Sequence, residues 1–121
     1  MIGRTTSILL LLIVTGCAGA ATDQASQNRN RLASVMSAYG SVQSLALAYM
    51  QRPICGQSPS PVCATPSIMS AIQRTDSAAN AAINRANAGV KAAPGESSTT
   101  MLIDAASSAV DDFRNATPQG K

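Results

Sequence analysis

This chain of 121 residues contains no histidine. Its remaining candidates for chemistry are three cysteines, Cys17, Cys55 and Cys63. Histidine is the commonest general base and metal ligand, so its absence removes the usual activator of a nucleophile. The spacing of Cys55 and Cys63 matches neither C-x-x-C nor any zinc-ligand pattern. No serine lies in a G-x-S-x-G or S-x-x-K arrangement. We therefore expect no catalytic residues, no metal site and no cofactor.

The first cysteine follows a short apolar segment. Arg4 precedes an apolar run from Ile8 to Val14, and the small residues Thr15 and Gly16 lead to Cys17. A run of about seven residues cannot span a bilayer, which takes about twenty. A basic start, a short apolar run and small residues at its end are typical of a secretory signal. The sequence Val14-Thr15-Gly16-Cys17 resembles the lipobox of bacterial lipoproteins, with valine where leucine is most usual.

The resemblance implies a signal peptide over residues 1–16, cleavage between Gly16 and Cys17, and lipidation of the Cys17 thiol. The mature protein would then be held at a membrane by acyl chains such as palmitate. In the family, an aspartate after the cysteine retains the protein in the inner membrane. Ala18 occupies that position here and favours the periplasmic face of the outer membrane. The alternative is cleavage after Ala20, at an A-x-A-like site, which would release a soluble secreted protein.

The cysteine count supports lipidation. Three cysteines in an exported protein leave one over, and modification of Cys17 leaves Cys55 and Cys63 as a pair. An oxidising compartment such as the periplasm allows that pair to form a disulfide. Both residues lie in a segment rich in proline and serine between Pro53 and Thr65. Closing so short a ring would add about 2–3 kcal/mol to the stability of the fold.

The elements that would carry these cysteines are helices. After a tether over residues 17–22, Thr22 or Asp23 could cap a first helix over residues 23–52, which Pro53 stops. Its apolar residues recur at steps of three and four, which places them on one face. Leu45, Leu47 and Met50 widen this stripe. It either packs against the chain's own second helix or forms a partner face. The stripe consists of Leu32, Val35, Tyr39, Val42, Ala46 and Tyr49.

Two further helices are predicted. Thr65 and Pro66 start one over residues 66–90, with mostly small residues facing inward. After the turn at Pro94 and Gly95, a third helix over residues 98–115 could be capped by Ser97, Ser98 or Thr99. Its predicted buried side comprises Leu102, Ala105 or Ala106, Ala109 and Phe113, with Met101 and Val110 beside them. The tail, residues 117–121, should be disordered.

These elements predict an all-α protein with one helical domain over residues 23–116. An antiparallel hairpin carries the disulfide-closed loop, and the third helix completes a three-helix bundle. The net charge of +3 is scattered, so we expect no nucleic-acid binding. The favoured role is structural or protein-interacting, in the cell envelope; the partner and oligomeric state stay open. A cell-wall tether is the alternative, since murein lipoproteins also end in a lysine, here Lys121.

Overall fold

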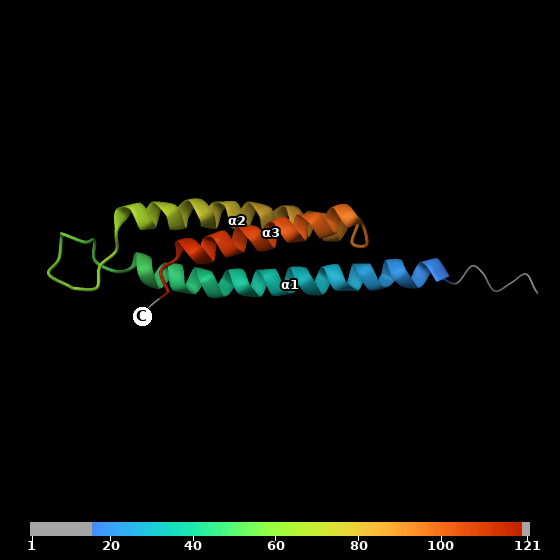
Figure 1. The fold of residues 1–121 in the computed structure, drawn as a ribbon, viewed down its shortest axis with the longest axis horizontal. Coiled ribbons are helices and arrows are strands. Elements are labelled where there is room, and N and C mark those ends of the chain that lie inside the picture. Colours follow the sequence, from blue (N-terminus) through green and yellow to red (C-terminus); the bar gives the residue numbers. More distant parts are fainter. Residues whose placement is uncertain (1–15, 120–121) are drawn as a thin grey trace, which may run out of the picture.

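The chain folds as a bundle of three helices. A computed structural model describes the backbone of residues 16–119, with α1 at Gly16–Met50, α2 at Pro66–Ala92 and α3 at Ser97–Ala116. Consecutive helices run antiparallel, and the long loop between α1 and α2 projects from one end of the bundle (Figure 1). This arrangement confirms the predicted all-α architecture. Val14, Thr15 and Lys121, on which parts of the sequence interpretation depend, lie outside the described residues.

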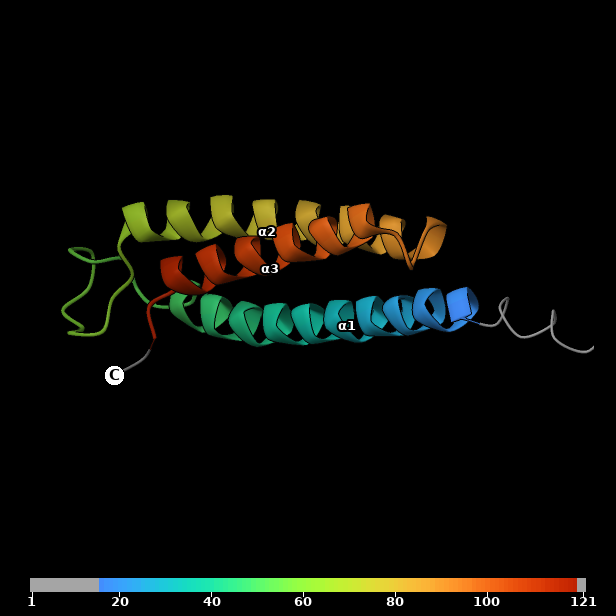
Figure 2. The same ribbon diagram turned by 45° about the vertical axis from the view of Figure 1, so that its right-hand side comes forward.

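The first helix is longer than predicted. It begins at Gly16, so that the backbone of residues 17–22, predicted as a tether, is helical and neither Thr22 nor Asp23 is a cap. The reason is local: alanines are strong helix formers, and no proline interrupts the chain before Pro53. At 1.5 Å per residue, the 35 residues of α1 extend over about 52 Å. The amino-terminal end of α1 runs past the turn between α2 and α3 (Figure 2).

The apolar stripe of α1 lies inside the bundle. Leu32, Val35, Val42, Ala46 and Tyr49 are buried, and Tyr39 packs partly buried beside them. The structure therefore assigns this stripe to the chain's own core, and these side chains are not exposed to a partner. On the other two helices the core contains Ile72, Ala79, Ile83, Ala86, Ile103, Ala106, Val110 and Phe113.

Three side chains predicted at or beside the core are exposed instead. Leu47 exposes 60% of its surface, Leu45 41% and Met101 70%. The stripe of α1 is thus narrower than the run of leucines near its end suggested.

On α3, Ile103 and Val110 are buried, whereas Leu102 and Ala109, predicted on the buried side, are only partly buried against the core. The predicted face was thus one position off, and because a helix rotates about 100° per residue, Met101, two positions before Ile103, lies on the opposite face.

The closest helix pair is α2 and α3. A Cβ added to Gly89 would lie 2.9 Å from Leu102 Cδ1 and 3.3 Å from Thr99 Oγ1, so the glycine permits this approach. The hydroxyl of Thr99, predicted as a cap for α3, instead donates to the carbonyl of Ala93 at 2.6 Å. The N-cap residue of α3 is Glu96. Thr99 therefore satisfies the last turn of α2, where carbonyls lack partners in the helix.

The amino-terminal half of α1 is fastened to the α2–α3 turn by a buried amide. Asn28 Nδ2 donates to the carbonyl of Pro94 at 2.8 Å, and Asn28 Oδ1 accepts from Thr100 Oγ1 at 3.1 Å and Gln24 Nε2 at 3.3 Å. Every polar atom of this fully buried side chain is thereby engaged. The network fixes the register between α1 and the other two helices.

The predicted disordered tail is ordered at its start. Thr117 is buried, and its hydroxyl donates to the carbonyl of Phe113 at 2.9 Å. Its backbone N–H also bonds the carbonyl of Phe113, at 3.1 Å. The end of α3 is closed by these two bonds, and residues 120–121 of the tail lie outside the described residues.

Candidate functional site

The loop between α1 and α2 is the first candidate site. Cys55 and Cys63 form a disulfide with their Cα atoms 4.9 Å apart, as the cysteine count predicted. Two backbone hydrogen bonds run beside it: Cys55 N–H donates to Ala64 O at 3.0 Å, and Ala64 N–H donates to Pro53 O at 2.8 Å. The disulfide and this short ladder close the base of the loop twice, once covalently and once by hydrogen bonds.

The base of the loop is packed onto the bundle. Tyr49, near the end of α1, is buried, and its hydroxyl accepts a 2.9 Å hydrogen bond from the backbone N–H of Thr65. Ala64 is fully buried, and the guanidinium of Arg52 lies 5.1 Å from the centre of the Tyr49 ring. Thr65 is the N-cap residue of α2, but its side chain makes no cap bond. Tyr49 therefore satisfies a backbone donor where α2 begins.

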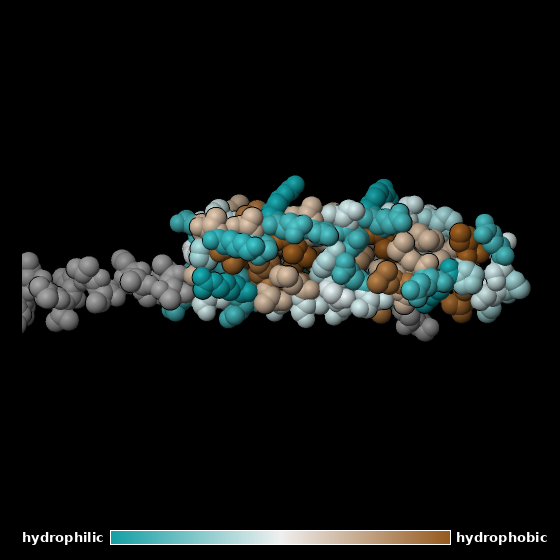
Figure 3. Space-filling model, turned by 180° about the vertical axis from the view of Figure 1, so that it is seen from behind, coloured by the Kyte–Doolittle hydropathy of each residue, from teal (hydrophilic) through white to brown (hydrophobic). Residues whose placement is uncertain are grey.

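The tip of the loop projects into solvent. Pro59, Pro61 and Val62 are exposed, Val62 by 53%, and Ile54 at the base is exposed by 37%. Neither a lysine, an arginine nor a carboxylate occurs between Arg52 and Arg74. Figure 3 shows apolar side chains at this end of the molecule among hydrophilic ones. The loop thus presents an uncharged, partly apolar surface on a fixed base.

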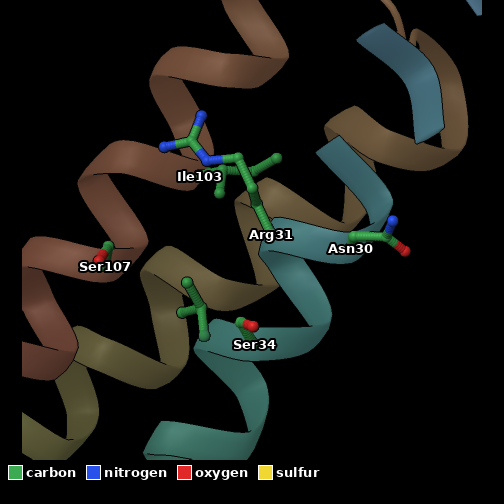
Figure 4. Close-up of a pocket in the computed structure, with 6 residues that line it drawn as sticks. Asn30, Arg31, Ser34, Ile103 and Ser107 are labelled. Carbon is green, nitrogen blue, oxygen red and sulfur yellow. The ribbon is translucent and has the colours of Figure 1, made fainter. Parts of the chain in front are cut away.

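A groove of about 340 Å³ between α1 and α3 is the second candidate. Asn30, Arg31, Ser34, Val35, Ile103 and Ser107 line it. Figure 4 shows the Arg31 side chain reaching towards α3, where its guanidinium pairs with Asp104. A serine nucleophile needs an adjacent base, and this lining contains neither histidine, lysine nor carboxylate. The lining of the groove therefore provides no acid–base pair.

A neighbouring hollow of about 280 Å³ continues along the same helix pair. Val35, Ala38 and Val110 form apolar parts of its lining, and Asp111 and Arg114 pair with each other at 3.0 Å on α3. Both ion pairs, this one and Arg31–Asp104, have about half of each side chain exposed. Exposed pairs contribute little stability, so they orient the rims of the groove without holding the helices together.

Tyr39 is the one described group whose ionisation the fold clearly alters. Its hydroxyl donates to Asp76 Oδ1 at 2.7 Å, and its ring lies 5.8 Å from that of Phe113. Burial, then the hydrogen bond to Asp76 and the charge of that carboxylate, raises the pKa of Tyr39 to about 12. A tyrosine that holds its proton this firmly acts as a hydrogen-bond donor between α1 and α2, a structural task.

The remaining predicted site residues lie at the opposite end from the loop. Gly16 begins α1, and Cys17 is in its first turn. Within the described residues, no three histidine, cysteine, aspartate or glutamate side chains gather as a metal site would require. None of the helices in the same part of the chain is long and apolar enough to cross a membrane.

Comparison with known proteins gives no relative. No protein-family model matches the chain, and neither a curated protein nor a solved structure is significantly similar to it.

Proposed function

We propose that the protein is a small lipoprotein of the bacterial envelope, held by acyl chains on Cys17, with a structural or protein-interaction role and no catalytic activity. The observation that carries the proposal is the segment Val14-Thr15-Gly16-Cys17 after a short apolar run and a basic residue. The aliphatic, small, glycine and cysteine positions all agree with the lipobox pattern.

An acyl anchor of this kind would hold the protein at the membrane without a contribution from the rest of the chain. Each buried CH₂ contributes about 0.8 kcal/mol, so two or three acyl chains give an attachment that is effectively permanent. A protein anchored in this way needs no further membrane-binding surface. The periplasmic face of the outer membrane is the location that we favour, because Ala18 follows the cysteine.

The arrangement of the bundle supports an interaction role. Cys17 lies at one end of α1 and the disulfide-closed loop follows the other, about 50 Å away along the helix. Figures 1 and 2 both show the loop beyond the end of the bundle. The interior is filled by the chain's own side chains. A rigid bundle with an anchor at one end and an exposed loop at the other is suited to presenting that loop.

Replacement of the lipidated cysteine tests the anchor. In cells that carry Cys17→Ser, the protein should leave the membrane fraction and the detergent phase, and mass spectrometry should find unmodified chains. The matched control is the double variant Cys55→Ser/Cys63→Ser, which loses the disulfide but keeps Cys17 and should remain in the detergent phase. Retention of Cys17→Ser in that phase would contradict the proposal. A wild-type amino terminus at Ala21, without acyl chains, would instead establish the secreted form.

A further inference from the structure

We infer that the hairpin of α2 and α3 presents its outer face, the side turned away from α1, to the same face of a second copy of the chain, with the two copies parallel. The inference rests on the proposed function, because it names the partner of an anchored protein whose role is to interact. It follows from the charges on this face, from its small side chains and from the orientation that a shared membrane gives to two copies.

On α2, the outer face carries two arginines. Asp76 marks the side of α2 that contacts α1, because its carboxylate accepts the hydrogen bond of Tyr39. A helix turns about 100° per residue, so Arg85 lies about 180° and Arg74 about 160° around α2 from Asp76. Both arginines are exposed, as are the alanines between them at positions 78 and 81. This side of α2 is therefore basic and otherwise small.

On α3, the outer face carries an aspartate. Thr100 marks the side of α3 that contacts α1, because its hydroxyl donates to Asn28. At about 100° per residue, Ala105 lies about 140° and Asp112 about 120° around α3 from Thr100. Both residues are exposed. The two helices of one hairpin therefore present opposite charges on the same side of the bundle.

These charges have no ion-pair partner within the chain. The ion pairs of the described residues join Arg31 to Asp104 and Arg114 to Asp111, and neither includes Arg74, Arg85 or Asp112. The basic groups on α2 and the carboxylate on α3 are thus available to a second molecule.

Arg74 and Asp112 lie at similar heights along the hairpin. An added Cβ at Gly89 of α2 would contact Thr99 and Leu102 of α3, which sets the alignment of the two helices. They run antiparallel (Figure 1), so eleven residues from this contact Ala78 lies level with Asp112. Arg74 lies about 6 Å further along, at 1.5 Å per residue. An arginine side chain covers that distance.

Charge selects one of the two ways in which the faces can meet about a two-fold axis. With the axis along the helices, α2 of each copy lies against α3 of the other at the same height, and Arg74 meets Asp112 of the second copy twice. With the axis across the helices, α2 lies against α2, and arginines face arginines, which opposes association. The favoured arrangement also leaves Cys17 of both copies at the same end, as attachment to one membrane requires.

The size of the face fits a contact between anchored molecules. The 20 residues of α3 extend over about 30 Å, and two helices side by side are about 20 Å wide. The face therefore covers roughly 600 Å² on each copy, which is at the lower end for specific interfaces. Acyl anchors in one membrane raise the effective concentration of the two copies, as a linker does, and so favour a contact that is weak in solution.

Photocrosslinking in intact cells tests the inference with the full-length anchored protein. A benzophenone amino acid is placed at Ala105, exposed on the outer face, and at Met36, exposed by 49% on α1, as the matched control. We expect an adduct of twice the chain's own mass from position 105 and none from position 36. Mass spectrometry after trypsin digestion should locate the attachment in α2 of the second copy, within residues 75–91.

Charge reversal decides whether the adduct reports the proposed contact. Arg74→Asp and Asp112→Arg should each lower its yield at least about tenfold, because like charges then meet across the interface. The combined variant Arg74→Asp/Asp112→Arg should restore the yield. Arg29→Asp, at an exposed position of α1, is the control and should leave it unchanged. Circular dichroism should show the same helical bundle in all four variants.

The inference is overturned by the absence of a dimeric adduct from position 105, by equal adducts from positions 105 and 36, by attachment to α3 of the second copy, or by a combined variant that stays as low as the single ones. An adduct with a different protein alone would also overturn it. The Cys17→Ser fractionation reads only the anchor, so failure of the anchor and failure of the hairpin contact are distinguishable.

Discussion

At the residue scale, Asn28 illustrates how a polar side chain can hold a core together. Its amide joins three segments that are distant in sequence: the start of α1, the turn at Pro94 and the start of α3 at Thr100. Buried polar groups that lose a partner cost about 1–3 kcal/mol. We therefore expect Asn28→Ala to lower the free energy of unfolding by about that amount, measured by denaturant titration with the disulfide intact.

Asn30→Ala is the control for this prediction, because Asn30 is an exposed residue of the same helix, two positions further along. Substitutions at exposed positions usually change stability by less than about 0.5 kcal/mol. Equal stabilities for the Asn28→Ala and Asn30→Ala variants would show that the amide network contributes nothing beyond the apolar core.

Tyr39 gives a prediction about pH. The pKa of its hydroxyl is raised from 10.0 to about 12, so the folded protein favours the protonated form. The stabilisation from this proton is fully present below pH 10 and is lost as the pH rises through about 12. Ultraviolet titration should therefore show a tyrosine step near 12 that is missing in Tyr39→Phe.

The same variant separates Tyr39 from other groups that titrate in alkaline solution. The free energy of unfolding of the wild type should fall more steeply between pH 10 and 12 than that of Tyr39→Phe, because only the wild type has this phenol to ionise. Parallel curves for the two proteins would contradict a role for the Tyr39–Asp76 hydrogen bond in this range.

Which residues could be predicted from the sequence depended on their polarity. The heptad-like spacing of Leu32, Val35, Val42 and Tyr49 revealed the buried face of α1, because periodicity detects apolar side chains. Asn28 and Thr117 continue the three-four spacing, four positions from Leu32 and from Phe113, and both are buried. They were missed because they are polar and the pattern counts apolar residues. Their hydrogen-bond partners include carbonyl groups of the α2–α3 turn and of the end of α3, and the sequence alone does not show that these groups are in reach.

At the element scale, Gly40 of α1 and Gly89 of α2 have different roles. A Cβ at Gly40 of α1 would have no atom within 4 Å, whereas one at Gly89 of α2 would meet Leu102 and Thr99. Alanine is favoured over glycine in a helix by about 1 kcal/mol. Gly40→Ala should therefore stabilise the protein by about 0.5–1 kcal/mol, as measured by thermal or denaturant unfolding.

Gly89→Ala is the matched comparison. The same gain in helix propensity applies, but the added methyl group must displace Leu102 and the Thr99 side chain that donates to Ala93. We expect this variant to be less stable than Gly40→Ala by about 1 kcal/mol or more. Equal stabilisation by Gly40→Ala and Gly89→Ala would show that the α2–α3 contact can take up the added methyl group without cost.

The ends of the helices were predictable where proline marks them. Pro66 begins α2, and Pro53 follows soon after α1 ends at Met50. The start of α1 and the cap of α3 were not predicted correctly, because serine, threonine and aspartate signal a cap only when the chain before them leaves the helix. At Thr22 and Asp23 the preceding alanines continue the helix. The Thr99 hydroxyl instead donates to the carbonyls of Gly89 and Ala93 at the end of α2.

At the scale of the whole molecule, the disulfide has two roles. It reduces the conformational entropy of the unfolded chain, and it holds the loop in shape. Closing a loop between Cys55 and Cys63 should contribute about 2–3 kcal/mol. A domain of this size has a total stability of about 5–15 kcal/mol, so the contribution is a large fraction. The double variant Cys55→Ser/Cys63→Ser should lose about that amount in equilibrium unfolding yet remain helical by circular dichroism, because the three helices pack through other residues.

Pro59→Ala/Pro61→Ala separates the effect of the disulfide from that of the loop sequence. Both prolines are exposed and distant from the core, so their removal leaves the disulfide, the Cys55–Ala64 ladder and the Tyr49–Thr65 hydrogen bond in place. This variant should lose about 0.4–1 kcal/mol of stability per proline, and so at most about 2 kcal/mol, because its unfolded chain has greater freedom. A loss as large as that of the cysteine variant would show that the two prolines stabilise the protein as much as the disulfide does. An unchanged stability of the cysteine variant would leave the disulfide with a role only in shaping the loop.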